Sequence, residues 1–303
     1  MRRRTPMLVL LTGVLALGAA WQAAPVLGGP TVTCIGEAPT VVGTPGDDTL
    51  NGTAGDDVIV GLGGNDTIDG AGGSDLICGG DGNDTISGGD GVDLLLGQGG
   101  DDSIDGGPGR DIALFLDAPG PLTANLATGG ASGEGADILL GVESLAGGPF
   151  ADHLTGNGGS NYIDGQPGND TIDGAGGNDA LDGDAGNDVL KGGAGYDLVD
   201  YGFAPRGVTA NLKTHVATGF GRDTLLGDED LQGSRFADTL TGTIIGNDLY
   251  GGRGNDRIYG LGGADHLFGE AGRDLLNGGP GRDVANGGAG VDSCPLSERK
   301  TSC

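Results

Sequence analysis

Residues 43–114 read GTPGDDTLN, GTAGDDVIV, GLGGNDTID, GAGGSDLIC, GGDGNDTIS, GGDGVDLLL, GQGGDDSID and GGPGRDIAL. This stretch is eight consecutive nonapeptides, with glycine at positions 1 and 4 and aspartate at position 6 of every unit. Position 8 is Leu or Ile in seven units and Ala113 in the last. Glycine allows a tight turn with positive φ, and positions 7–9 have the alternation of a short strand with one inward side chain. The stretch therefore predicts a turn and a short strand every nine residues.

The same period extends over most of the chain. A second run covers 147–200 in six units and a third covers 233–295 in seven. Two inserts of 32 residues, 115–146 and 201–232, separate the runs and resemble each other at an offset of 86 residues. For example, LTANL at 122–126 matches VTANL at 208–212. We therefore expect the solenoid to continue through the inserts as wider coils, the alternative being two floppy loops that separate three rolls.

Composition and missing motifs exclude several classes of protein. Glycine accounts for 70 of 303 residues and aromatic residues for only 4%, which is too few large side chains for an ordinary enzyme core and pocket. The net charge is −28, and affinity for nucleic acid depends on Lys and Arg, so no nucleic-acid partner is expected. The sequence has no HExxH and no GxSxG motif, and no catalytic residue is assigned. His153 and His266 occupy position 7 and are expected to face outward.

The repeat G-G-x-G-x-D-x-U-x, where U is a large aliphatic residue, resembles the RTX, or haemolysin-type, calcium-binding repeat. The resemblance covers residues 43–295. It implies an all-β fold, a parallel β-roll (β-solenoid) in which six residues form a turn, three form a strand and two nonapeptides make one coil. It also implies multiple Ca²⁺ ions between same-side turns, bound by aspartates and backbone carbonyls, and calcium takes six to eight such oxygen ligands. A glycine-rich solenoid without metal would not explain aspartate at a fixed phase.

The resemblance assigns metal binding to the position-6 aspartates. These are Asp48, Asp57, Asp66, Asp75, Asp84, Asp93, Asp102, Asp111, Asp152, Asp170, Asp179, Asp188, Asp197, Asp238, Asp256, Asp265, Asp274, Asp283 and Asp292. Asn161 and Asn247 occupy the same position in two repeats, where we expect weaker calcium binding because the charge is lost. Stacked coils place same-side carboxylates about 5 Å apart, where they repel by about 0.8 kcal/mol in bulk water. A divalent cation reverses this repulsion, so we expect calcium to drive folding.

The N-terminus carries a predicted export signal, and cysteines lie toward both ends of the chain. Residues 1–5 are basic, 7–20 are apolar, and small residues precede a cut after Ala20, so the sequence predicts a secretory signal peptide and a secreted, extracellular protein. The apolar segment is shorter than the ~20 residues of a spanning helix, so no stable membrane span is expected after cleavage; the alternative is a short membrane anchor. Four cysteines suggest two disulfides, for which three pairings are possible. Pairing Cys34 with Cys78 and Cys294 with Cys303 is favoured because it would clamp both ends of the solenoid.

These features define the expected organisation and function. The segments are a signal peptide (1–20), an N-terminal cap segment (21–42), β-roll runs (43–114, 147–200, 233–295), inserts (115–146, 201–232) and a C-terminal cap (296–303). The sequence predicts an exported calcium-ion-binding repeat protein that acts as an extracellular structural or binding module, with calcium ions and a cell-surface or matrix glycan as partners. The alternative is a divergent polysaccharide-acting β-solenoid enzyme or an adhesin fragment. Basic residues are scattered, although Arg206, Lys213, His215 and Arg222 cluster in the second insert.

Overall fold

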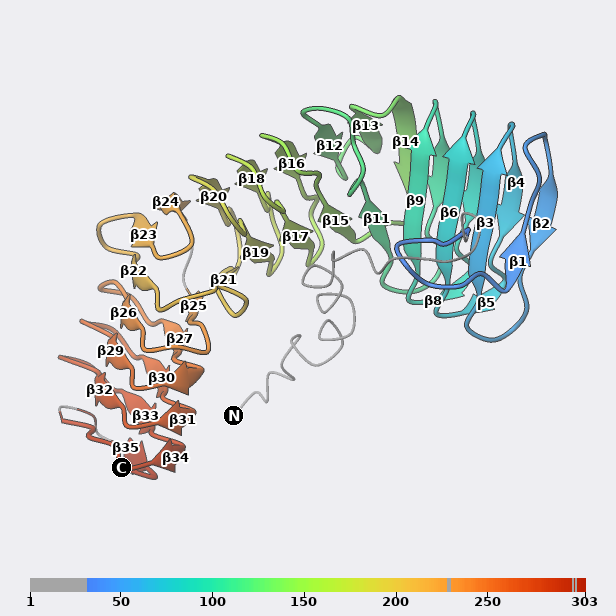
Figure 1. Ribbon diagram of the computed structural model, residues 1–303. Helices are drawn as coiled ribbons and strands as arrows, with labels where there is room; N and C mark the ends of the chain where they lie inside the picture. Colours follow the sequence, from blue (N-terminus) through green and yellow to red (C-terminus); the bar gives the residue numbers. More distant parts are fainter. Residues whose placement is uncertain (1–31, 228–229, 296, 298) are drawn as a thin grey trace.

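The computed structural model describes residues 32–227, 230–295, 297 and 299–303. Within these residues every regular element is a β-strand, and the strands wind into a parallel β-solenoid (Figure 1). Strands of successive coils pair in parallel at a spacing of 18 residues, with Leu50 opposite Ile68 and Ile59 opposite Ile77. The prediction of an all-β parallel β-roll with two nonapeptides in each coil is therefore confirmed. The predicted signal peptide lies outside the described residues.

Successive nonapeptides contribute strands alternately to two sheets. The 14-stranded sheet contains, in spatial order, β1 (Val41–Val42), β3 (Val58–Gly63), β6 (Leu76–Asp81), β9 (Leu94–Gly99), β11 (Ile112–Leu114), β15 (Ser144–Ala146), β17 (Tyr162–Asp164), β19 (Ala180–Asp182), β21 (Leu198–Asp200), β25 (Asp230–Gln232), β27 (Asp248–Tyr250), β30 (His266–Phe268), β33 (Val284–Asn286) and β35 (Arg299–Thr301). The 16-stranded sheet contains β2 (Thr49–Asn51), β4 (Thr67–Asp69), β7 (Thr85–Ser87), β10 (Ser103–Asp105), β14 (Ala136–Leu140), β13 (Gly130–Ser132), β12 (Thr123–Asn125), β16 (His153–Thr155), β18 (Thr171–Asp173), β20 (Val189–Lys191), β24 (Arg222–Leu226), β23 (Val216–Thr218), β22 (Thr209–Asn211), β26 (Thr239–Thr241), β29 (Arg257–Tyr259) and β32 (Leu275–Asn277). Short ladders at the turns are formed by β5 (Gly72–Gly73) with β8 (Asp90–Gly91), and by β28 (Arg253–Gly254), β31 (Ala271–Gly272) and β34 (Ala289–Gly290).

The core is a line of aliphatic side chains between the two sheets. Ile59 and Ile77 of one sheet and Ile68 and Ile86 of the other are at most 1% exposed, and they belong to one apolar cluster that continues from coil to coil. The residues on either side of Ile68 in β4 are exposed. This is the alternation with period two that the sequence shows at positions 7–9. Each coil therefore holds the next through one central side chain from each sheet.

Each insert places three strands in the 16-stranded sheet and one in the 14-stranded sheet. In the first insert β12 pairs in parallel with β16, β14 pairs in parallel with β10, and β13 lies antiparallel between β12 and β14. The second insert repeats this arrangement with β22, β23 and β24. One sheet gains two more strands than the other at each insert. The solenoid bends at both inserts, with the extra strands on the convex side of the arc (Figure 1).

Two disulfides tie down the ends of the described chain. They join Cys34 to Cys78 and Cys294 to Cys303, so the favoured pairing is confirmed. Cys34 and Cys78 lie in a second apolar cluster, with Val60, Leu96 and Leu114, on the outer face of the 14-stranded sheet. The described residues contain no helix that is long and apolar enough to cross a membrane.

Candidate metal sites

The position-6 aspartates of alternate repeats form two columns, one at the turns that lead into each sheet. In the column that precedes the 16-stranded sheet, the backbone N–H of Asp48 donates to Oδ1 of Asp66, and the N–H of Asp66 donates to Oδ1 of Asp84, both at 2.8 Å. The same bond joins Asp84 to Asp102 at 2.8 Å. One oxygen of each carboxylate is thus held by the backbone of the preceding coil. This contact requires a side-chain oxygen that accepts a hydrogen bond at one phase of the repeat.

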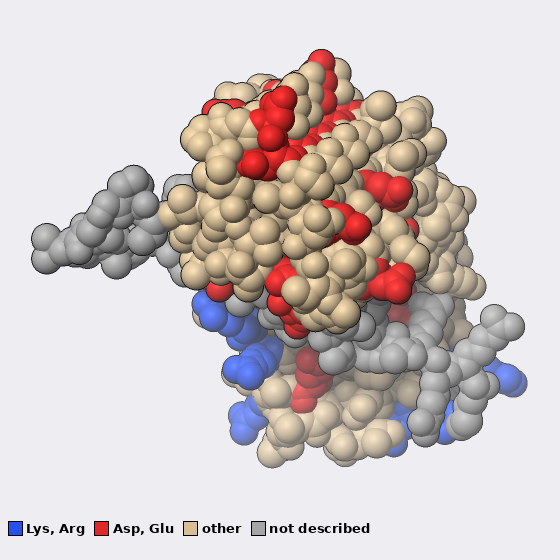
Figure 2. Space-filling model, turned by 90° about the vertical axis from the view of Figure 1, so that its right-hand side faces the viewer, with Lys and Arg blue, Asp and Glu red and all other residues tan. Residues whose placement is uncertain are grey.

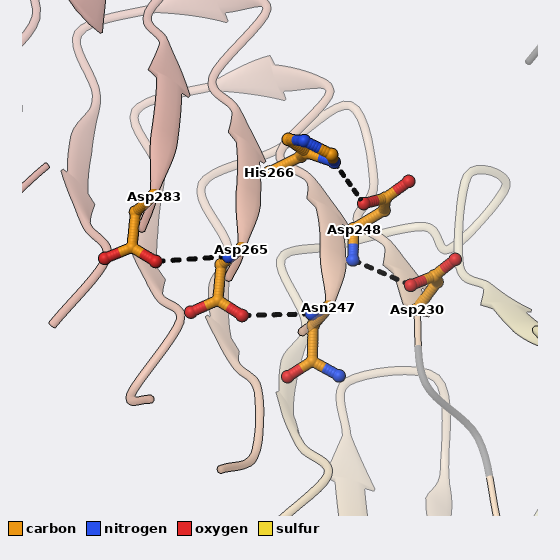
Figure 3. A network of polar contacts seen from close by, with 6 residues as sticks. All are labelled: Asp230, Asn247, Asp248, Asp265, His266 and Asp283. Atoms are coloured by element: carbon orange, nitrogen blue, oxygen red, sulfur yellow. Dashed lines mark hydrogen bonds and ion pairs between the residues drawn. The ribbon is translucent and has the colours of Figure 1, made fainter. Parts of the chain in front are cut away.

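The second column precedes the 14-stranded sheet and has the same pattern. Figure 3 shows its C-terminal part, where the N–H of Asp265 donates to Oδ1 of Asp283 at 3.1 Å and the N–H of Asn247 donates to Oδ1 of Asp265 at 2.9 Å. On the outer face of the neighbouring strands, His266 Nδ1 lies 2.8 Å from Oδ1 of Asp248. His153 and His266 are both exposed, as expected for position 7.

The second carboxylate oxygen, Oδ2, is left without a partner through most of both columns. Oδ2 is buried and accepts no hydrogen bond in Asp66, Asp75, Asp84, Asp93, Asp102, Asp111, Asp170, Asp179, Asp188, Asp256, Asp265, Asp274 and Asp292. A Cβ added to Gly61 would collide with Oδ2 of Asp66 and with the carbonyl oxygen of Gly79, so a carboxylate and a backbone carbonyl lie together beside that glycine. A buried charge without a partner is costly in free energy. Carboxylate and carbonyl oxygens are calcium ligands, and the residues present therefore fit this ion.

Burial also perturbs the titration of these groups. It raises the pKa of Asp102 and Asp256 to about 7 and that of Asp170 to about 8, and neighbouring aspartates add to the effect. At Asp102, Asp170 and Asp256 the ionised form is therefore unfavourable unless a cation or a proton accompanies it. Asp57 differs, because hydrogen bonds from Thr40 and Thr53 lower its pKa.

A family comparison identifies the repeat. The model of the RTX calcium-binding nonapeptide repeat matches residues 42–77, 79–113, 140–172, 164–199, 241–276 and 271–294. The chain belongs to this RTX family. The RTX repeats are calcium-binding, and β-solenoids of this type are typically non-catalytic and come from secreted proteins. No curated protein is significantly similar to the chain.

All nineteen aspartates assigned from the RTX pattern lie in the two columns, but four of them are satisfied by the protein itself. In these four residues Oδ2 accepts the backbone N–H of the residue four positions earlier. They are the first aspartates of their columns or runs, namely Asp48, Asp57, Asp152 and Asp238. These turns therefore have no free Oδ2.

Of the basic residues in the second insert, Arg206 donates to the carbonyl of Gly219 and His215 Nδ1 lies 2.9 Å from the carbonyl oxygen of Leu225.

Sequence reasoning missed three acidic residues that continue the RTX columns through the inserts. Oδ1 of Asp137 accepts the N–H of Asp102 at 3.1 Å, and Oδ1 of Asp223 accepts that of Asp188 at 3.2 Å. Glu143 takes the same role for Asp111 at 3.0 Å. The repeated D-x-L-L at 137–140 and 223–226 was the available signal. This motif has no fixed position relative to the nonapeptides, because the length of each insert, 32 residues, is not a multiple of nine.

The columns limit how an ion can be held. Among the residues that the structure describes, no three His, Cys, Asp or Glu side chains are grouped so as to hold one metal ion. An ion in an RTX column would therefore take at most two carboxylates, from adjacent coils, and its other ligands from backbone carbonyls.

Figure 2 shows acidic side chains in rows on the face at the N-terminal run, with Lys and Arg confined to the lower part of the view. Arg110 is the only Lys or Arg between residues 32 and 190.

Proposed function

We propose that this protein is an exported calcium-binding RTX protein whose β-roll folds on binding Ca²⁺ and acts outside the cell as a structural or binding module. The two columns of buried carboxylates with unpartnered Oδ2 atoms support this proposal. The nineteen aspartates named above, together with the carbonyls of the position-1 glycines, are the proposed ligands. Asp48, Asp57, Asp152 and Asp238, whose Oδ2 already accepts a backbone N–H, would bind an ion more weakly than the others. Calcium supplies the positive charge that the columns lack, and the chain supplies the spacing and the glycine turns.

The test is a calcium titration followed by circular dichroism. In chelator, the net charge of −28 and the single central side chain per strand should leave the chain largely disordered. Millimolar calcium, the range of extracellular modules, should produce a β-rich spectrum. Magnesium at the same concentration is the control, since it demands a stricter octahedral geometry. A β-rich spectrum that persists in chelator would refute the folding switch.

We propose a glycan as the macromolecular partner and the outer face of the 16-stranded sheet as its contact surface. This face carries exposed hydroxyl groups in register, with Thr49 opposite Thr67 and Thr67 opposite Thr85. Hydroxyl and carboxylate groups on a rigid, regular surface can hydrogen-bond sugar hydroxyls. Pull-downs on cell-wall and matrix polysaccharides with and without calcium test the assignment. Retention that does not depend on calcium would contradict it.

We also propose that the signal peptide is removed on export and that the mature chain forms one solenoid. The secreted chain would begin at Trp21 and contain one continuous solenoid with a cap at each end. Amino-terminal sequencing of the protein from the culture medium checks the predicted cleavage after Ala20. Recovery of the chain only in the membrane fraction would favour the uncleaved anchor.

A further inference from the structure

Three aspartates lie in a row on the outer face of the 14-stranded sheet, away from the turn columns. Asp164 ends β17, Asp182 ends β19 and Asp200 ends β21. Asp164 lies opposite Asp182. Leu181 lies opposite Val199, so Asp182 and Asp200, which follow them, are also in register. Neighbouring strands lie about 4.8 Å apart, and like charges directly opposite each other destabilise a sheet. The row therefore needs a compensating charge.

The row is confined to the second run. The same column holds Val60, Cys78 and Leu96 in the first run, and a stacked pair, Tyr250 and Phe268, in the third. Ala146 and Gln232 are the strand neighbours at the two ends of the row. Aspartate at position 9 of this sheet is thus not a requirement of the repeat.

These carboxylates are buried, and the groups that donate hydrogen bonds to them are neutral. Asp164, Asp182 and Asp200 are 3%, 2% and 6% exposed. Their hydrogen-bond donors are the backbone N–H groups of residues 166, 184 and 202 and the Gln166 side chain, at 2.7–2.9 Å. Within the described part of the chain, no Lys, Arg or His forms an ion pair with them. Burial, reinforced by repulsion from Asp184 and among the three aspartates, raises the pKa of Asp164 to about 7 and that of Asp182 well above its ordinary value.

A buried tyrosine hydroxyl provides a second, independent observation. Tyr162 lies two residues before Asp164 on the same face of β17, is 7% exposed, and its hydroxyl has no hydrogen-bond partner. Tyr162 shares this face of the sheet with Asp164, Asp182 and Asp200. An unpartnered, buried oxygen on the same face as several carboxylates is the arrangement expected at an oxygen-ligated cation site.

We propose that Asp164, Asp182 and Asp200 form a second set of Ca²⁺ sites on the outer face of the sheet, in addition to the RTX turns. The strand spacing puts Asp164 and Asp200 about 10 Å apart, so one ion cannot bridge all three. Asp182 is therefore shared between an ion beside Asp164 and an ion beside Asp200, which agrees with the lack of any three-carboxylate group among the described residues. The Tyr162 hydroxyl supplies a further oxygen.

Equilibrium dialysis with radioactive calcium tests the proposal by counting ions at saturation. Asp182→Asn should bind one or two ions fewer than the wild type. The matched control is Asp173→Asn, at position 9 of the other sheet in the same run, where Asp173 is paired with Lys191 at 2.7 Å; its ion count should equal that of the wild type. Circular dichroism of the same samples follows the RTX columns separately. An unchanged count in folded Asp182→Asn overturns the proposal.

Terbium luminescence gives a second readout that does not depend on removing a carboxylate. Tb³⁺ substitutes for Ca²⁺ and emits when a nearby excited tyrosine transfers energy to it. Tyr162→Phe should lower the emission excited at 280 nm, and it should have no further effect in the Asp182→Asn background. Equal emission from the wild type and Tyr162→Phe would show that no ion lies beside this hydroxyl and overturn the proposal.

Discussion

At position 6 of a turn, the choice between aspartate and asparagine decides whether an oxygen is left for a cation. Asp84 accepts the N–H of Asp66 through Oδ1 and leaves Oδ2 unpartnered. Asn161 uses Oδ1 to accept the N–H of Asn157, at 2.8 Å, and its Nδ2 donates to the carbonyl of Glu143, at 2.9 Å. The amide therefore satisfies the turn from within the protein, and no negative charge is left to attract calcium.

Asn161→Asp should convert this turn into a calcium site. Aspartate loses the donor to Glu143 and gains a charge, so the turn is less stable without metal and binds one more ion. We expect the ion count at saturation to rise by one, measured by equilibrium dialysis. The control is Asn169→Asp, which adds the same charge at the exposed position 5 of another turn in the run. An equal gain in both variants would show that charge alone, and not position 6, attracts the ion.

Sharing between coils predicts that interior aspartates matter more than terminal ones. Asp84 lies between Asp66 and Asp102 and would serve two ions, whereas Asp48 would serve one and already accepts hydrogen bonds from Thr44. Asp84→Ala also leaves the buried N–H of Asp66 without an acceptor, which costs about 1–3 kcal/mol. We expect Asp84→Ala to raise the calcium midpoint of folding about tenfold, or about 1.4 kcal/mol, and Asp48→Ala to raise it less. Equal midpoints in circular dichroism would refute the sharing.

At the scale of elements, the inserts extend the solenoid and do not interrupt it. β12, β13 and β14 are hydrogen-bonded on both sides, between β16 and β10. Their inward-facing residues Ala124, Ala131 and Leu139 are buried in the main core. Packing of this kind explains why both inserts keep the same length.

Hydrogen exchange can measure this continuity. In calcium, the amides of β12 and β13 should exchange as slowly as those of β16, because they are paired in the sheet and backed by the core. They should exchange about 100-fold or more slowly than the amide of Gly120, which lies in a bend between Pro119 and Pro121. The second insert serves as an internal replicate. Fast exchange throughout both inserts would instead indicate two loops between three independent rolls.

The periodic features of this fold could be predicted from sequence, whereas the features between the periods could not. A nine-residue spacing determines which residues are in the turn and which are in the core, so Asp66 and Ile68 were placed correctly. The antiparallel β13 was not foreseen, since LTANL indicates a strand but not its direction or its partner. The Asp164–Asp182–Asp200 row was missed because position 9 looks like ordinary polar surface until alternate repeats are assigned to the same sheet.

At the scale of the whole molecule, the two columns make the metal-free fold a strongly acidic solenoid whose carboxylates are crowded together. Its positive residues do not relieve this crowding in the first half, where Arg110 is the only Lys or Arg between residues 32 and 190. Calcium and protons are then alternative ways to neutralise the same buried oxygens. The raised pKa values of the buried aspartates give the pH range in which protons replace calcium.

Acid should therefore favour the fold when calcium is removed. The folded-state pKa values of Asp102, Asp170 and Asp256 are raised to about 7, 8 and 7 from an ordinary value of 3.8, so folding takes up protons between about pH 4 and pH 8. The stability that protonation contributes is fully present below about pH 4 and is lost as the pH rises through these raised values. In chelator, the β signal in circular dichroism should increase as the pH is lowered from 8 to 5. Calcium that binds to the acid-folded chain must displace these protons, so adding calcium at pH 5 should release protons into an unbuffered solution. Calcium binding at pH 5 without proton release would mean that the ions are held by backbone carbonyls, without the Oδ2 atoms of the two columns.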